Sequence, residues 1–97
     1  MDILYLDSTL DDFEWMSYYY GEIFPQGWAN MSKHLKATEQ ILYQNPFIGR
    51  VYNDSKTVRQ INIHRTPFSL IYRVSDLHIQ VLRVWDMRRD NSKMRFD

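Results

Sequence analysis

The 97-residue chain contains no cysteine and has only three glycines and three prolines. Without cysteine it can form neither a disulfide framework nor a thiolate zinc site. The scarcity of glycine and proline excludes a flexible linker or a low-complexity segment. No apolar run reaches the ~18 residues of a membrane-spanning helix, and the first residues lack a basic leader followed by an apolar stretch. We therefore expect a cytoplasmic protein that does not contact a membrane.

Apolar side chains are abundant enough to build one core. Hydrophobic residues make up 44% of the chain and aromatic residues 15%, which excludes a disordered chain. The formal net charge is zero, but residues 1–49 carry seven acidic and two basic side chains, whereas residues 50–97 carry five acidic and ten basic ones. The neutral total argues against a nucleic-acid-binding protein, but the basic C-terminal half can still offer one face to an anionic partner.

Hydrophobic spacing predicts the secondary structure. A short apolar run predicts a strand over residues 3–6. Apolar residues at intervals of three and four predict two amphipathic helices, over residues 10–23 and 28–42, with a break at residues 24–27. Asn45 precedes Pro46 and should end the second helix, since a residue before proline disfavours the helical conformation. Runs over residues 58–65, 68–74 and 79–85 then predict three strands.

This order of elements predicts a small α+β domain that spans residues 1–97. An N-terminal strand precedes an antiparallel helical hairpin and three antiparallel strands, which form one sheet with the hairpin on one face. The core should contain Leu10, Phe13, Met16, Trp28, Met31 and Leu35 from the helices, and Ile61, Ile63, Leu70, Tyr72, Val81 and Val84 from the sheet.

The first predicted helix also carries residues outside its apolar stripe. Tyr20 continues the stripe, so Trp15 and either Tyr18 or Tyr19 should lie partly outside the core, because consecutive helical residues point ~100° apart. These aromatic residues form either a partner surface or a cover for the second helix. The two aspartates at positions 11 and 12 are expected at the start of the helix, where carboxylates complement its dipole.

Candidates for catalysis are few. His34, His64 and His78 fall on a predicted helix, strand and turn, and none has a histidine or glutamate partner at metal-ligand spacing. The three glycines are isolated, so the chain has no glycine-rich phosphate loop. We therefore expect neither a metal ion nor a cofactor.

The arginines of the C-terminal half are more informative. The basic residues that flank or follow predicted strands are Arg59, His64, Arg65, Arg73, Arg83, Arg88 and Arg89. Guanidinium groups that converge on a sheet can hold a phosphate or a carboxylate by paired hydrogen bonds. Alternatively, several of them lie at strand ends and pair with Asp76, Asp86 and Asp90, which stabilises a surface little.

Four segments resemble the RelE/ParE toxin superfamily in sequence and in order. They are Asn-Pro-Phe-Ile-Gly-Arg at 45–50, Val-Arg-Gln-Ile at 58–61, Pro-Phe-Ser-Leu-Ile-Tyr-Arg at 67–73 and Val-Leu-Arg-Val-Trp-Asp-Met-Arg-Arg-Asp at 81–90. The resemblance covers essentially the whole chain. It implies a bacterial toxin of a type II toxin–antitoxin system, held in a hetero-oligomeric complex by a cognate antitoxin that wraps around it and blocks it.

One branch of this superfamily cleaves messenger RNA on the ribosome. In that branch, lysines on the second strand and an arginine on the third face the substrate, but the matching positions here hold Gln60, Asn62 and Ser69. These side chains supply no base, acid or cation for attack by a ribose hydroxyl. A metal-independent nuclease would therefore need another catalytic set, and the candidates are His64, Arg65 and Arg89.

The resemblance is closer to the ParE-like branch, which implies a toxin that poisons DNA gyrase without enzymatic activity. The loss of the lysines and the segments at 45–50 and 67–73 favour this branch. Two features depart from it, because the net charge is neutral and Trp85–Asp86 stands where relatives often carry Leu-His. The alternatives are the ribosome-dependent nuclease and a non-toxic relative that binds only its antitoxin.

This interpretation assigns two contact surfaces. The residues expected to contact the target, gyrase or the ribosome with its messenger RNA, are Arg73, Arg83, Trp85, Arg88 and Arg89. The residues expected to contact the antitoxin are Trp15, Tyr19, Arg65 and Arg73.

Overall fold

The computed structural model describes residues 1–96, except for the side chain of Lys93. Its strands are β1 (Asp2–Tyr5), β2 (Arg50–Val51), β3 (Val58–Asn62), β4 (Phe68–Val74) and β5 (His78–Asp86), and its helices are α1 (Leu10–Tyr18) and α2 (Trp28–Gln44). Short helical turns lie at Asp7–Thr9, Tyr19–Ile23, Pro25–Gly27 and Asn91–Lys93. No helix in this part of the chain is long and apolar enough to cross a membrane.

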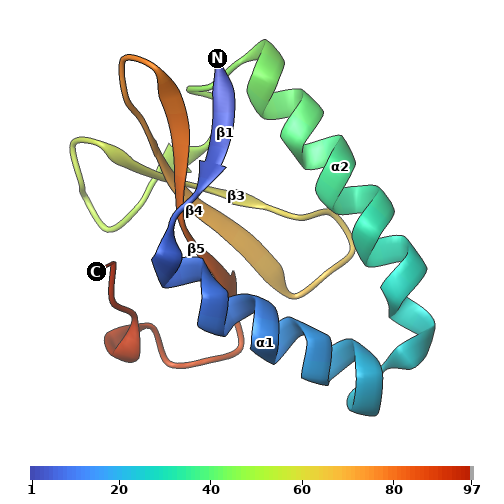
Figure 1. Ribbon diagram of the computed structural model, residues 1–97. Helices are drawn as coiled ribbons and strands as arrows, with labels where there is room; N and C mark the ends of the chain where they lie inside the picture. The colour runs from blue at the N-terminus through green and yellow to red at the C-terminus, as the bar shows by residue number, and fades with distance from the viewer. Residues whose placement is uncertain (97) are drawn as a thin grey trace.

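The five strands form one sheet in the order β1-β5-β4-β3-β2 (Figure 1). β1 runs parallel to β5, and the other neighbouring strands are antiparallel. The predicted α+β class and the order of strand, two helices and three strands are confirmed, and β2 is an additional two-residue strand at one edge. The predicted strand over residues 58–65 is too long, because β3 ends at Asn62, and His64 and Arg65 lie in the turn before β4.

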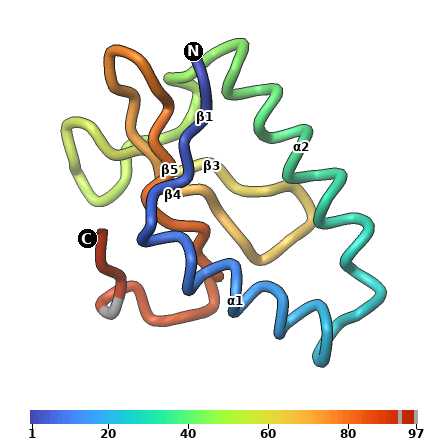
Figure 2. The backbone as a smooth tube through the Cα atoms, viewed as in Figure 1, coloured from blue at the N-terminus to red at the C-terminus, as the bar shows by residue number. Residues whose placement is uncertain are grey.

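The two helices diverge from the turn at Pro25–Gly27 and lie on one side of the sheet (Figures 1 and 2). α1 continues as a π-helical turn that ends at Ile23, and α2 ends at Gln44, directly before Asn45, as predicted. The tube view shows the helices spreading apart as a V, more open than a closely packed hairpin (Figure 2).

The main core lies between the helices and the sheet. Met16 and Met31 are buried in it, and Phe13 and Leu35 pack against it while half-buried, as predicted. The six predicted sheet residues all belong to this core. Leu10 and Trp28 do not, because they are 63% and 49% exposed. Spacing shows which residues share a helix face, but it does not show whether the sheet extends far enough to cover both ends of that face.

A smaller core lies on the opposite face of the sheet. Tyr52, Ile71 and Trp85 are buried there, and Met87 and Met94 from the segment after β5 pack against them. The hydroxyl of Tyr52 donates to the sulfur of Met94 at 3.7 Å. β4 and β5 are thus covered on both faces, which agrees with their nearly continuous apolar sequence.

The Asn-Pro-Phe-Ile-Gly-Arg segment fastens the end of α2 to the sheet. The backbone N–H of Gly49 donates to the hydroxyl of Tyr72 at 2.9 Å, and that hydroxyl donates to the carbonyl of Pro46 at 2.8 Å. A Cβ at Gly49 would lie 2.5 Å from the Tyr72 hydroxyl, so the close approach requires glycine. Arg59 on β3 adds a hydrogen bond to the Gly49 carbonyl at 2.8 Å. This segment, which is one of the four that resemble the superfamily, therefore has a structural role: it attaches the end of α2 to β3 and β4.

Candidate functional site

The end of β5 beside α1 brings together six of the predicted site residues. They are Trp15 on α1, Tyr19 in the π turn, Arg83 and Trp85 on β5, and Arg88 and Arg89 directly after β5. The helix and the strand are far apart in sequence, and the fold places them side by side. Arg73 does not join this group, because it lies near the far end of β4, and Arg65 lies in the turn before β4.

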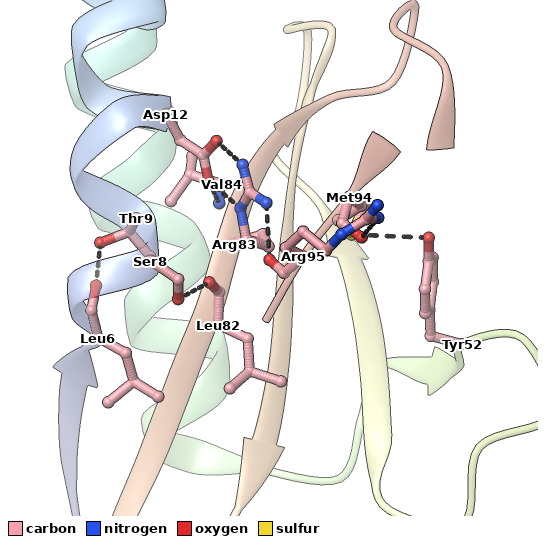
Figure 3. A network of polar contacts seen from close by, with 10 residues as sticks. All are labelled: Leu6, Ser8, Thr9, Asp12, Tyr52, Leu82, Arg83, Val84, Met94 and Arg95. Atoms are coloured by element: carbon pink, nitrogen blue, oxygen red, sulfur yellow. Dashed lines mark hydrogen bonds and ion pairs between the residues drawn. The ribbon is translucent and has the colours of Figure 1, made fainter. Parts of the chain in front are cut away.

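A buried ion pair joins α1 to β5 (Figure 3). The guanidinium of Arg83 donates to both carboxylate oxygens of Asp12, with Nη2–Oδ1 at 2.6 Å and Nε–Oδ2 at 2.8 Å. The same carboxylate accepts the backbone N–H of Val84 at 2.9 Å. Arg83 also donates to the carbonyl of Arg95 at 2.7 Å, so the pair holds the C-terminal segment. The hydrogen bond with Asp12 raises the pKa of Arg83, although burial opposes its charge.

This geometry corrects one prediction and adds to another. Asp12 lies in the first turn of α1, as predicted, but its side chain is also buried against β5. The N-cap residue Thr9 makes no capping bond with its side chain and instead donates to the carbonyl of Leu6 at 2.7 Å (Figure 3). Arg83 is only 9% exposed and all three of its nitrogen atoms donate within the chain. It therefore supports the surface from beneath and cannot itself contact a target.

A second carboxylate, Asp86, holds Arg88 at the end of β5. Arg88 donates to both oxygens of Asp86, with Nη2–Oδ2 at 2.7 Å and Nε–Oδ1 at 2.9 Å. The indole N–H of Trp15 donates to the same carboxylate at 3.0 Å. Burial alone would raise the pKa of Asp86, but the hydrogen bonds from Arg88 and Trp15 outweigh it and hold the pKa below its usual value. Asp86 is therefore charged at neutral pH and neutralises Arg88.

Tyr19 is buried beneath Arg88, which corrects its prediction as an exposed contact. The guanidinium of Arg88 lies 4.5 Å from the centroid of the Tyr19 ring. Tyr19 and Tyr20 both pack on Phe68, at centroid distances of 6.0 Å each. They can share this side because the helix widens into a π turn, where the α-helical angle between successive residues does not apply. Tyr18 is the exposed member of the aromatic run.

Arg89 carries an exposed charge on an aromatic support. Its guanidinium lies 4.8 Å from the ring centroid of Trp85 and 5.4 Å from that of Trp15, within the range of cation–π attraction. Trp85 is only 2% exposed, so it serves as a platform for Arg89 and cannot itself meet a target, contrary to prediction. We call Arg89, Trp15 and Trp85 the Arg89 cluster.

Two predicted antitoxin contacts lie outside this cluster. Arg65 is exposed in the turn before β4, where its φ of 60° is left-handed. Arg73 is exposed near the other end of β4 and donates to Gln80 at 2.7 Å. Together with the half-buried Trp15, these residues mark separate parts of the surface and do not form one patch.

A pair of histidines joins α2 to the turn before β4. The ring of His64, next to Arg65, lies 5.3 Å from the ring of His34. Partial burial lowers the pKa of His34, and the facing His64 and the nearby cations lower it further. Among residues 1–96, no three histidine, aspartate or glutamate side chains are grouped as they would be to hold a metal ion.

The positions that carry cations in the messenger-RNA-cleaving branch hold a neutral cluster here. The amide of Gln60 on β3 donates to the hydroxyl of Ser69 on β4 and to the side-chain oxygen of Asn62, both at 3.3 Å. The Ser69 hydroxyl donates to the same Asn62 oxygen. Gln60 and Ser69 are also buried. The three side chains therefore satisfy one another and include no charged or titratable group.

A shallow groove follows α1 towards the turn at which the two helices meet. One hollow of about 480 Å³ is lined by Leu10, Phe13, Glu14 and Ser17. A second hollow of about 370 Å³ is lined by Ser17, Tyr20, Gly21, Pro25 and Trp28. Ser17 borders both hollows, so we treat them as one feature, the α1 groove. The two apolar residues that sequence analysis wrongly placed in the core, Leu10 and Trp28, lie in this groove.

Comparisons with known proteins agree with this fold. A model of the family described as ParE toxin of type II toxin–antitoxin system, parDE, matches residues 3–91. Among solved structures, the chain is similar to one from the chromosomal ParDE toxin–antitoxin system of P. aeruginosa, with a TM-score of 0.65 and 23% sequence identity over 87% of this chain and 92% of that one. At this identity the likeness shows the fold. No curated protein matches the chain.

The family match confirms the ParE-like resemblance that the four sequence segments predict. It extends from β1 to the residues after β5 and so includes the Arg89 cluster, both helices and all five strands. The chain therefore belongs to the ParE toxin family of type II toxin–antitoxin systems.

Proposed function

We propose that this toxin inhibits DNA gyrase by binding to it, without enzymatic activity, and that a cognate antitoxin neutralises it. The neutral cluster of Gln60, Asn62 and Ser69 is the observation that most supports a binding mechanism. Cleavage of messenger RNA requires a base, an acid and a cation at the scissile phosphate, and these three side chains supply none of them. Gyrase acts in the cytoplasm, so we place the toxin there.

The exposed end of β5 is the target contact that we propose. Arg88 and Arg89 follow β5 where the chain leaves the sheet, and both are exposed. Arg83 and Trp85 act indirectly, because they support this surface from beneath. Arg73 is also exposed, but it lies near the far end of β4 and is kept as a separate proposed contact.

The α1 groove is the site that we propose for the antitoxin. An amphipathic helix or an extended segment can place its apolar side chains against Leu10, Phe13 and Trp28. Exposed apolar surface of this kind commonly marks a protein interface. Antitoxin carboxylates that meet Arg65 and Arg73 would add electrostatic complementarity, which speeds association and fixes the orientation.

The experiment that tests the function uses the purified toxin in two assays. With gyrase and plasmid DNA, we expect loss of supercoiling and accumulation of gyrase-cleaved DNA. With translating ribosomes, we expect intact messenger RNA. Arg88→Ala combined with Arg89→Ala should reduce the effect on gyrase. Arg50→Ala is the matched control, because Arg50 is an exposed arginine on β2, outside the proposed contacts.

Codon-positioned cuts in messenger RNA would overturn the proposal and would assign catalysis to His64, Arg65 and Arg89. These residues lie at the same end of the sheet, since Met87 donates its backbone N–H to the carbonyl of Pro67 at 2.8 Å. Tight antitoxin binding without either activity would instead identify a non-toxic relative.

A further inference from the structure

Three arginines lie around the end of β5, and two of them are neutralised within the chain. Arg83 pairs with Asp12, and Arg88 pairs with Asp86. Among the residues that the structure describes, no side chain forms a salt bridge with Arg89. The group therefore retains one uncompensated positive charge, and this charge is on an exposed residue.

The aromatic rings prepare Arg89 for binding. An arginine side chain normally loses rotamer freedom when it binds a partner, and a side chain already stacked on rings loses less. The central carbon of the Arg89 guanidinium lies over both indole rings, and such cation–π contacts use none of its N–H groups as hydrogen-bond donors.

The surrounding charges favour one carboxylate over a chain of phosphates. Asp11 is exposed one helical turn before Trp15, and Asp90 is exposed next to Arg89. A nucleic-acid backbone presents successive phosphates and needs several uncommitted cations to bind. Of the three arginines in this group only Arg89 is uncommitted, so the group can neutralise one anionic group and not a run of phosphates. A single carboxylate matches both the charge and the paired donors of a guanidinium.

The surface next to Arg89 is aromatic. The ring of Tyr18 lies 5.6 Å from the ring of Trp15, and Tyr18 is 52% exposed. An apolar side chain that neighbours the bound carboxylate can pack on this surface. Tyrosine and tryptophan are common anchors of protein interfaces, which favours a protein as the partner.

We propose that the Arg89 cluster binds a single aspartate or glutamate carboxylate of the toxin's protein target, next to an apolar residue that packs on Trp15 and Tyr18. The identity of that target as gyrase rests on the proposed function. The chemistry of the site is independent of it, because it follows from the charges and rings around Arg89.

The direct test is an NMR titration of the full-length ¹⁵N-labelled toxin. The probes are N-acetyl-aspartyl-phenylalanine amide, its asparaginyl counterpart and inorganic phosphate. We expect the aspartyl peptide to shift the Nε–H signal of Arg89 and the indole signals of Trp15 and Trp85. The asparaginyl peptide should bind about tenfold more weakly, since it cannot form a charge-assisted bond.

Arg89→Lys should lower the affinity of the toxin for the aspartyl peptide by a similar factor, because an ammonium group cannot bind a carboxylate in a bidentate manner. Arg50→Lys is the matched control and should leave the titration unchanged. Equal binding of both peptides, or tighter binding of phosphate than of the aspartyl peptide, would overturn the proposal.

A second arm separates this inference from the proposed function. The affinity for gyrase in the absence of DNA is measured for the wild-type toxin and for the variants Arg89→Lys and Arg50→Lys. Loss of gyrase binding in Arg89→Lys alone supports both proposals. If the aspartyl peptide binds but gyrase does not, the carboxylate site is supported and the proposed target is wrong. If gyrase binds equally to all three proteins and the peptide does not bind, the carboxylate site is wrong and the target is supported.

Discussion

The carboxylate of Asp12 receives two hydrogen bonds from the guanidinium of Arg83, 71 positions away in the sequence. This contact makes the first turn of α1 and the middle of β5 one unit. It also extends to the C-terminal segment through the carbonyl of Arg95. The stability of the domain should therefore depend strongly on either partner.

Asp12→Asn should lower the free energy of unfolding by about 3 kcal/mol, because the charge of Arg83 is then left unpaired in a buried position. The double variant Asp12→Leu with Arg83→Met should lose much less, since it leaves no charge buried. Urea denaturation monitored by tryptophan fluorescence measures both values. A loss below about 1 kcal/mol for Asp12→Asn would show that water or a rearranged side chain compensates the arginine.

Met31→Ala should lower the free energy of unfolding by about 2–5 kcal/mol, because it opens a cavity in the main core. Leu10→Ala changes the apolar stripe of the other helix, α1, at an exposed position and should change stability by less than about 0.5 kcal/mol. Chemical denaturation of the two variants checks this difference. Similar losses in both would contradict the burial pattern of the helices.

Leu10→Glu should weaken antitoxin binding by at least about tenfold, because it places a charge in the apolar α1 groove. Leu77→Glu is the matched control, since Leu77 is 74% exposed in the turn between β4 and β5, away from the groove. Calorimetric titration with the antitoxin measures the affinity. Equal affinities for the two variants would rule out the groove as the antitoxin site.

Reversing Arg65 and Arg73 to glutamate should weaken antitoxin binding at low salt, with a smaller effect at high salt because ions screen exposed charges. Arg50→Glu controls for the general change of net charge. The association rate at several salt concentrations is the measurement. Unchanged affinity of the double variant at low salt would remove the electrostatic part of the proposed interface.

Lowering the pH should destabilise the contact between His34 and His64. The pKa of His34 is lower in the folded chain, so the unfolded chain binds more protons as the pH falls below about 6.5. The stability associated with this pair is therefore present above that pH and is lost below it. Denaturation curves of the wild type and His64→Gln between pH 5 and 8 should diverge, with the wild type losing more stability at the acid end. Parallel pH profiles would contradict a repulsive pair.

The order of elements could be predicted from the sequence because local signals determine it. The break after Phe24 and the end of α2 before Pro46 follow from backbone chemistry, and the period change after Gly49 distinguishes strands from helices. Burial at the helix ends was harder to predict. Leu10 and Trp28 fit the apolar stripe, and only the extent of the sheet shows that nothing covers them.

The candidate site could be predicted only in part. Sequence analysis found Arg88 and Arg89 because they follow an evident strand, and the structure leaves both exposed. It could not distinguish them from Arg83, whose pairing with Asp12 depends on how a helix and a distant strand align. The sequence also could not predict that Tyr19 is buried in the core, because a π turn has no reliable sequence signal.

The position of β1 in the sheet affects how the chain folds during synthesis. β1 is made first, yet its only neighbour in the sheet is β5, the last strand to be made. Pairing between such distant segments is slow, because a long loop must close before any contact forms. While β5 is still inside the ribosome, β1 has no strand to pair with and Asp12 has no arginine to bind. The sheet and the ion pair of the nascent chain therefore stay incomplete until β5 has emerged.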